Sequence, residues 1–146
     1  MNYQRELIYS VETIWDHGTG GNIRLGEYVI NFDTPAEFEG KGEAPCPDQL
    51  FLAALSGCVL NTFIDFKKRL RVEAIDVKLE TSATVKLIPR EGYRIKGITI
   101  VIIIQSEKKF IETNKRCAEL ACEYCHLTRS IESAIPIEFK INVESN

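Results

Sequence analysis

The sequence predicts an α+β protein with the element order β-β-α-β-β-α-α-β and mainly antiparallel strand pairing. Two observations lead to this class: an apolar run of helical length over 47–70, and a continuous β-branched run over 98–104 of the kind found in the middle of a sheet. The 146 residues contain no internal repeat, low-complexity tract or linker. We therefore expect a single domain over residues 1–146.

The N-terminal part predicts a hairpin followed by a loop. Residues 7–15 and 23–32 show partial alternation of apolar and polar side chains, which is typical of half-buried strands. The segment between them reads His-Gly-Thr-Gly-Gly at 17–21, so we expect a glycine-rich turn. Proline, glycine and charged residues concentrate between Asp33 and Pro47, where a loop is predicted.

A long helix is predicted from Pro47 to about Leu70. Proline suits the first helical position, Asp48 complements the positive end of the helix dipole, and the basic run 67–69 lies at the negative end. The middle of this helix, 50–60, is apolar nearly all round. A helix of this kind is central to its protein, and we expect neighbours on every side of it.

The C-terminal half predicts a second hairpin, two helices and a last strand. Strands over 75–88 and 93–105 are joined by Pro-Arg-Glu-Gly, which has turn chemistry. Residues 108–125 then indicate a helix and 128–134 a shorter one. Alternating apolar residues from Ile137 to Val143 complete the sheet.

Composition restricts the possible functions. A net charge of −3 argues against nucleic-acid binding, and 45% hydrophobic with 27% charged residues is ordinary for a soluble protein. The N-terminal residues lack the pattern of a signal peptide, and no uncharged apolar run has the length of a membrane span. We therefore expect a cytoplasmic protein, not bound to membranes, whose five cysteines are reduced at rest. Their odd number indicates redox or metal chemistry.

Cys58 lies deep in the apolar helix, so it is either ordinary core or a reactive thiol that needs a cationic partner. A second cluster is formed by Cys117, Cys122, Cys125 and His126. Its C-x-x-C-H spacing matches c-type haem attachment, but the chain shows no export signal and no good second axial ligand. A thioredoxin-like motif belongs at the start of a helix, whereas this one lies at a helix end.

Two interpretations of the cluster remain. Zinc could take all four residues, but structural zinc sites normally show two separated ligand pairs in loops, so we expect no metal and no cofactor. Alternatively, Cys58 attacks a hydroperoxide, and a second thiol captures the resulting sulfenic acid as a disulfide. Spacing alone does not choose among the three cysteines of the cluster as that second thiol.

Three motifs resemble one known family. Residues 47–58, Pro-Asp-Gln-Leu-Phe-Leu-Ala-Ala-Leu-Ser-Gly-Cys, are similar to a Pro-Glu-Gln-Leu-Phe/Leu segment that precedes a peroxidatic cysteine by the same spacing. Gly-Gly-Asn-Ile-Arg at 20–24, ahead of Thr-Pro at 34–35, resembles the region of an active-site arginine. Cys125 lies where a second cysteine is usual. The family is that of the osmotically inducible and organic hydroperoxide resistance proteins, OsmC/Ohr.

This resemblance implies an OsmC-like fold, in which antiparallel sheets pack around a long central helix in an intertwined homodimer. It implies a thiol peroxidase that reduces organic hydroperoxides, and hydrogen peroxide less well, with recycling by a dithiol or lipoylated protein reductant. Cys58 would attack, Cys125 would resolve, Arg24 would activate the thiolate, and Asp48 would orient Arg24. The sequence departs from the family pattern at His126, usually Pro, at Asp48, usually Glu, and at Cys46, often a polar residue.

Helix geometry adds a prediction about Asp48. Ten residues of helix separate it from Cys58, or about 15 Å along the axis, so the acidic residue that acts on a given Cys58 should belong to a second chain. Apolar residues on nearby turns should favour organic hydroperoxides. These predicted pocket residues are Phe51, Leu55, Val59 and Phe63.

Two alternatives stay open at this stage. The chain could be a thiol-disulfide oxidoreductase of the same fold that uses Cys122 and Cys125, or a non-enzymatic metal- or ligand-binding member of the fold. Cys46 and Cys122 have no role carried over from the family, so we assign them to core packing.

Overall fold

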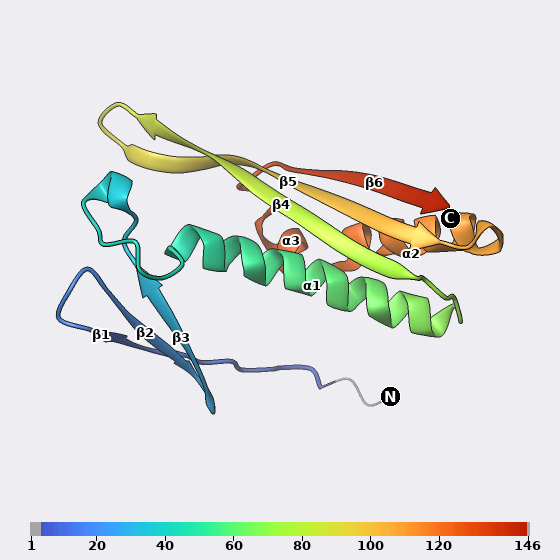
Figure 1. Cartoon of the computed structure of the whole chain (residues 1–146), viewed down its shortest axis with the longest axis horizontal. Helices are drawn as coiled ribbons and strands as arrows, with labels where there is room; N and C mark the ends of the chain where they lie inside the picture. The colour runs from blue at the N-terminus through green and yellow to red at the C-terminus, as the bar shows by residue number, and fades with distance from the viewer. Residues whose placement is uncertain (1–3, 146) are drawn as a thin grey trace. The chain divides into compact units, whose positions relative to one another are not determined.

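The computed structural model describes residues 4–145; residues 1–3 and 146 of the predicted domain 1–146 lie outside the described part. The chain divides into two compact units, Met1–Leu50 and Phe51–Asn146. Each unit contains a three-stranded sheet (Figure 1). The predicted α+β class is confirmed, and the single domain stays a prediction.

The first unit holds three strands where two were predicted. They are β1 (Glu12–Trp15), β2 (Gly20–Leu25) and β3 (Tyr28–Asp33), paired antiparallel in that order. The segment 23–32 was wrongly taken as one strand, because it reverses at a two-residue turn between Leu25 and Tyr28. Gly26 in this turn has φ 63°, a left-handed conformation that glycine adopts without strain. The alternation of side chains continues across the turn and so hides it.

Asp33 ties the end of β3 to the loop that follows, which contains the 3-10 turn η1 (Ala36–Phe38). Its carboxylate is 5% exposed and accepts hydrogen bonds from the Thr19 hydroxyl at 2.6 Å and from the Thr34 and Glu43 backbone N–H groups at 2.8 and 3.0 Å. These donors, Thr19 first, hold the pKa of Asp33 below its ordinary value. The carboxylate therefore organises this loop in its charged form.

We expect the contribution of Asp33 to stability to disappear in acid. Because its pKa is lower in the folded chain than in the unfolded chain, this stabilisation is complete above the unfolded value and is lost as pH falls through the folded value. Urea unfolding of the wild type and Asp33→Asn, from about pH 6 to about pH 2, should show a stability difference that shrinks toward the acid end. A difference that stays constant over this range would contradict the assignment.

Helix α1 (Pro47–Arg69) begins and ends as predicted. One face is buried at positions three or four residues apart, namely Leu55, Cys58, Val59 and Phe63. Much of the other side is exposed, including Ala53, Ala54, Gly57, Asn61 and Ile64. Within one chain, α1 is thus covered on one face and not on every side as expected. Its length and apolar composition alone would also suit a membrane span, but its buried face belongs to the core of the second unit.

The second sheet has the order β4-β5-β6, with bounds Asp76–Ile88, Gly92–Ser106 and Ile137–Ser145. The predicted hairpin of β4 and β5 is confirmed, and β5 is the central strand. Strand β6 pairs parallel to β5, an exception to the mainly antiparallel plan. Parallel pairing is possible here because the chain crosses over through helices between the two strands.

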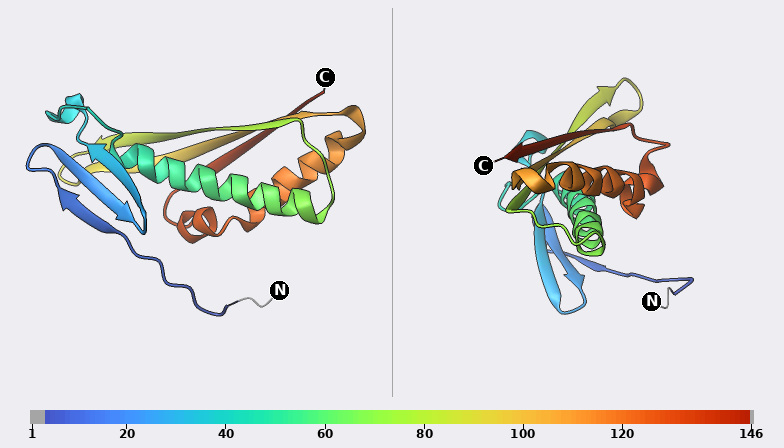
Figure 2. Two further views of the ribbon diagram at one scale, coloured as in Figure 1. Left: turned by 60° about the horizontal axis from the view of Figure 1, so that its bottom comes forward. Right: turned by 90° about the vertical axis from the view of Figure 1, so that its right-hand side faces the viewer.

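The crossover consists of η2 (Lys108–Phe110), α2 (Ile111–Tyr124) and α3 (His126–Ile131). Figure 2 shows α1, α2 and α3 against one face of the second sheet. On that face the alternate isoleucines of β5, from Ile98 to Ile104, are at most 2% exposed, and the residues between them are half-buried. The core of this unit therefore forms where β5, α1 and α2 meet.

Candidate active site

Cys58 lies on the buried face of α1, in the core of the second unit. Its side chain is 9% exposed, and all five cysteines are free thiols. The Thr62 hydroxyl donates to the Cys58 carbonyl at 2.8 Å, a contact within the helix that leaves the thiol available. The thiol thus faces the core of the protein and has only a small opening to solvent.

Cys125 lies at the junction between α2 and α3 and is fully buried. Its backbone is extended, with φ −63° and ψ 113°, so the chain changes direction there. The Cys125 N–H still bonds the Ala121 carbonyl at 3.0 Å, and its own carbonyl accepts the Arg129 N–H at 3.1 Å. These bonds anchor the junction to both helices, and the Cys125 thiol lies close enough to the Cys58 thiol to affect its pKa.

The surroundings of Cys58 favour its neutral form. Burial raises the pKa of the thiol, and the neighbouring Cys125 side chain raises it further. The backbone N–H groups of Leu127 and His126 act in the opposite direction but more weakly. A nucleophilic Cys58 therefore needs a proton acceptor or a cation beside it.

His126 reaches the same thiol from the first position of α3. Its Nδ1 lies 3.5 Å from the Cys58 Sγ, and the residue is exposed to solvent. Sequence reasoning treated His126 as a possible zinc ligand and as a departure from the usual proline, and it missed this contact. Its place directly after Cys125 was the signal that could have found it.

Arg24 and Asp48 belong to the first unit, whereas the two thiols belong to the second. Arg24 lies on β2, where its exposed side chain forms an ion pair with Glu12 at 3.5 Å. Asp48 is exposed in the first turn of α1. Their predicted actions on Cys58 stay predictions.

A family model for OsmC-like proteins matches residues 40–140. The chain belongs to the OsmC-like family. Its fold resembles the crystal structure of an organic hydroperoxide resistance protein OsmC from Legionella pneumophila, with a TM-score of 0.74, 17% identity and coverage of 97% of this chain and 99% of the other. A second similar structure is the organic hydroperoxide resistance protein OhrB of Bacillus subtilis, with a TM-score of 0.66, 19% identity and coverage of 94% and 98%.

A relative by sequence is the protein YmaD of Bacillus subtilis (strain 168). It is 21% identical to this OsmC-like protein over 128 residues, which make up 85% of each chain. Family membership and these neighbours together show that the chain has an OsmC-like fold.

Three of the four predicted pocket residues of this OsmC-like protein are buried in the core. Leu55, Val59 and Phe63 are 0–2% exposed and pack in the core, so they contact other side chains and not an open cavity. Phe51 is half-buried at the edge of the same core. Their role in substrate binding stays a prediction, for which Phe51 is the best placed of the four.

The other cysteines of the second unit are poor nucleophiles. Burial raises the pKa of Cys117, which is fully buried. Burial also raises the pKa of Cys122 to about 11, so this thiol is neutral near pH 7. That value disfavours Cys122 as the attacking thiol of a Cys122–Cys125 oxidoreductase. Among residues 4–145, no three His, Cys, Asp or Glu side chains are grouped to hold a metal ion, so the zinc interpretation has no geometric support.

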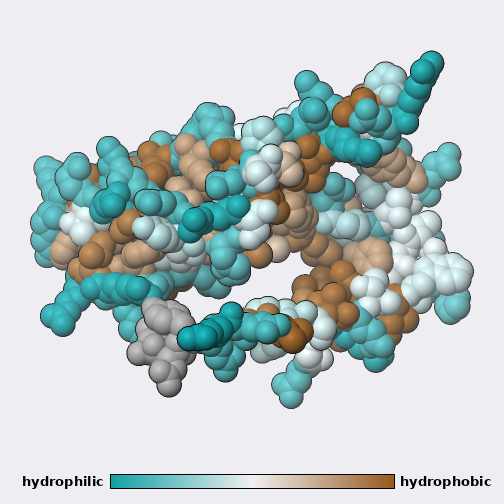
Figure 3. Space-filling view, turned by 180° about the vertical axis from the view of Figure 1, so that it is seen from behind, coloured by the Kyte–Doolittle hydropathy of each residue, from teal (hydrophilic) through white to brown (hydrophobic). Residues whose placement is uncertain are grey.

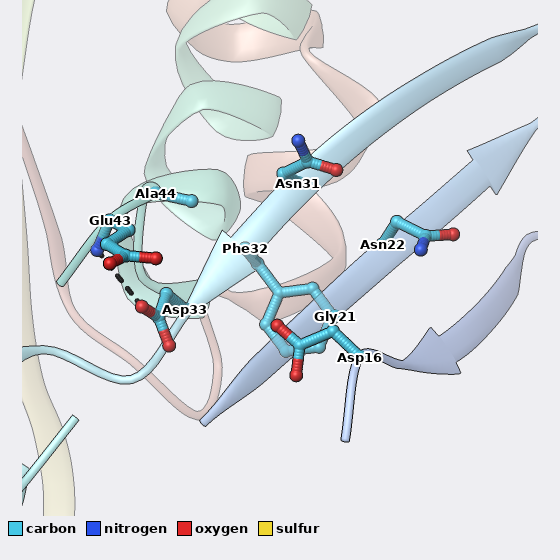
Figure 4. A pocket seen from close by; sticks show the side chains of 8 residues that line it. All are labelled: Asp16, Gly21, Asn22, Asn31, Phe32, Asp33, Glu43 and Ala44. Atoms are coloured by element: carbon cyan, nitrogen blue, oxygen red, sulfur yellow. Dashed lines mark hydrogen bonds between the residues drawn. The ribbon is translucent and has the colours of Figure 1, made fainter. Parts of the chain in front are cut away.

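The first unit contains a separate polar cavity of about 290 Å³ beside β2 and β3 (Figure 4). Its lining consists of Asp16, Gly21, Asn22, Asn31, Phe32, Asp33, Glu43 and Ala44. Because this lining contains no thiol and no imidazole, it offers no redox chemistry. The paired thiols and His126 are therefore the candidate active site of this OsmC-like protein.

Proposed function

We propose that this OsmC-like protein is a thiol peroxidase that reduces organic hydroperoxides, and hydrogen peroxide less well. The observation that carries the proposal is that the buried, free thiols of Cys58 and Cys125 are neighbours in the core, close enough for Cys125 to raise the pKa of Cys58. Two neighbouring thiols can form a disulfide with little movement of the backbone. No cofactor is needed for this chemistry.

The proposed reaction has two steps at sulfur. The Cys58 thiolate attacks the terminal oxygen of the hydroperoxide; an S–O bond forms, the O–O bond breaks, and the alkoxide leaves and is protonated to the alcohol. The Cys125 sulfur then attacks the Cys58 sulfenic acid, so that an S–S bond forms and water leaves with the Cys125 proton. A dithiol or lipoylated protein reductant reopens the disulfide by thiol exchange.

The apolar surroundings of Cys58 support the choice of substrate class. The thiol lies in a core of aliphatic and aromatic side chains, with half-buried Phe51 at its edge. An alkyl group of an organic hydroperoxide gains from leaving water for such surroundings, and hydrogen peroxide has no such group. We also propose that the enzyme acts in the cytoplasm, where both thiols start reduced.

In this proposal, Arg24 and Asp48 act on Cys58 within a homodimer. The exposed side of α1 carries small residues, Ala53, Ala54 and Gly57, together with Ile64, which is 51% exposed. Small residues allow two helices to approach closely, so a second copy of the chain can cover this face. Other apolar side chains also reach the surface, some of them visible as brown areas in Figure 3. In the dimer, Asp48 of the second chain would orient the Arg24 that activates Cys58.

One equivalent of cumene hydroperoxide added to the reduced protein tests the proposal directly. Peptide mapping by mass spectrometry should find a Cys58–Cys125 disulfide, which should be missing from Cys58→Ser. The matched control is Cys46→Ser, which changes the one cysteine of the first unit and should leave the bond unaffected. A Cys122–Cys125 disulfide that also forms in Cys58→Ser would refute the peroxidase and support the oxidoreductase.

A further inference from the structure

His126 contacts the reacting sulfur, yet the proposed function gives it no role. We propose that His126 is a catalytic residue: its imidazole takes the proton of the Cys58 thiol and delivers it to the alkoxide that leaves the hydroperoxide. The inference rests on the proposed function, and it concerns the residue at which this chain departs from the proline that is usual in the family. Proline has no group that could accept a proton.

The contacts and the exposure of His126 support this role. Nδ1 of His126 lies 3.5 Å from the Cys58 Sγ, close enough for a long hydrogen bond to sulfur. The Ser130 hydroxyl donates to the His126 carbonyl at 2.6 Å and fixes the first turn of α3. Because His126 is exposed whereas Cys58 is buried, the imidazole links the thiol to solvent and can exchange its proton there.

The other groups around Cys58 do not perform this task. From the α2–α3 junction, the Cys125 side chain raises the pKa of Cys58 and so opposes removal of its proton. From α2, Cys122 borders the same core as a neutral thiol, and β5 contributes isoleucines. Among the described residues, the imidazole of His126 is the basic side chain whose hydrogen-bond contact with the Cys58 sulfur the structure shows.

In the first step, the proton that leaves the thiol is then the one that the alkoxide receives. The thiol proton moves to the imidazole and leaves a thiolate beside an imidazolium. The thiolate displaces the alkoxide from the hydroperoxide, and two electrons pass from sulfur to the O–O bond. The imidazolium gives its proton to the alkoxide, so that an alcohol leaves and His126 is neutral again.

The test is the pH profile of Cys58 alkylation by iodoacetamide, read from the Cys58 peptide in the full-length protein. His126→Asn keeps a hydrogen-bonding side chain and the backbone N–H but cannot be protonated. The midpoint of its profile should lie about one to three pH units above that of the wild type, and its rate at pH 7 should fall about tenfold or more. His17→Asn replaces the chain's other histidine, whose ring packs at a tilt against Trp15, and should match the wild type.

Unchanged midpoints in both His126→Asn and His126→Gln would overturn the role of His126 as base. The acid role has its own readout: the rate of Cys58 sulfenic acid formation with cumene hydroperoxide near neutral pH, divided for each variant by the thiolate fraction that its alkylation profile gives at that pH. A rate in His126→Asn equal to that of the wild type would overturn proton delivery. Because alkylation uses no peroxide, a wild type that fails to consume hydroperoxide refutes the proposed function separately, while the alkylation profile still decides the base role.

Discussion

Cys58→Ser is expected to lose turnover of cumene hydroperoxide by at least about 10³-fold, because a serine hydroxyl has no accessible anion and no reducing sulfur to transfer electrons to oxygen. Turnover is measured as hydroperoxide consumed with excess dithiothreitol. In the wild type, many equivalents should be consumed per chain. In Cys58→Ser, consumption should not exceed that of dithiothreitol alone.

Two further cysteine variants separate attack from resolution. Without added dithiol, Cys125→Ser should consume hydroperoxide but accumulate Cys58 sulfinic acid on further exposure, because no thiol remains to capture the sulfenic acid. Cys122→Ser is the matched control, since Cys122 lies three residues from Cys125 and is not expected to take part. A Cys122→Ser variant as inactive as Cys58→Ser, or residual turnover in Cys58→Ser, would contradict the assignment.

Mixing a slowed variant, Asp48→Asn, with the inactive Cys58→Ser should restore activity if Asp48 acts on the Cys58 of another chain. Asp48→Asn alone is expected to slow turnover about 10- to 100-fold, the effect of losing one charge-assisted hydrogen bond in the transition state. After unfolding and refolding together with Cys58→Ser, half of the dimers should be mixed, with one complete site each. Activity should then reach about a quarter of the wild type.

The exposed ion pair of Arg24 with Glu12 does not prevent Arg24 from pairing with Asp48 of another chain. Pairs of this exposure contribute little to stability, so Arg24 is free to bind a stronger partner. The control is a mixture of Cys58→Ser with Cys125→Ser. After one equivalent of hydroperoxide it should contain no Cys58–Cys125 disulfide, because both thiols of a pair come from one chain. Failure of Asp48→Asn and Cys58→Ser to complement each other would show that Asp48 acts within its own chain or not at all.

Local patterns in the sequence predicted nearly all the helices and strands of this protein. Pro47 and the basic run 67–69 mark the ends of α1, and the β-branched run 98–104 marks the central strand, since these signals depend only on neighbouring residues. The turn at Gly26 escaped notice because alternation does not reveal a reversal. The parallel pairing of β6 also escaped, because strand direction depends on the path of the crossover and not on the strand's own residues.

The candidate active site was likewise predictable in part from the sequence and in part only from the tertiary structure. The sequence by itself determined the residues on which the proposed chemistry depends: a cysteine in an apolar helix within a family motif, and a second cysteine at a helix end. Only the tertiary structure decided which thiol meets Cys58, that Leu55, Val59 and Phe63 are core residues, and that His126 reaches the sulfur. Contacts across 67 and 68 residues of chain depend on how helices pack against a sheet, and no periodicity within a helix or strand records that packing.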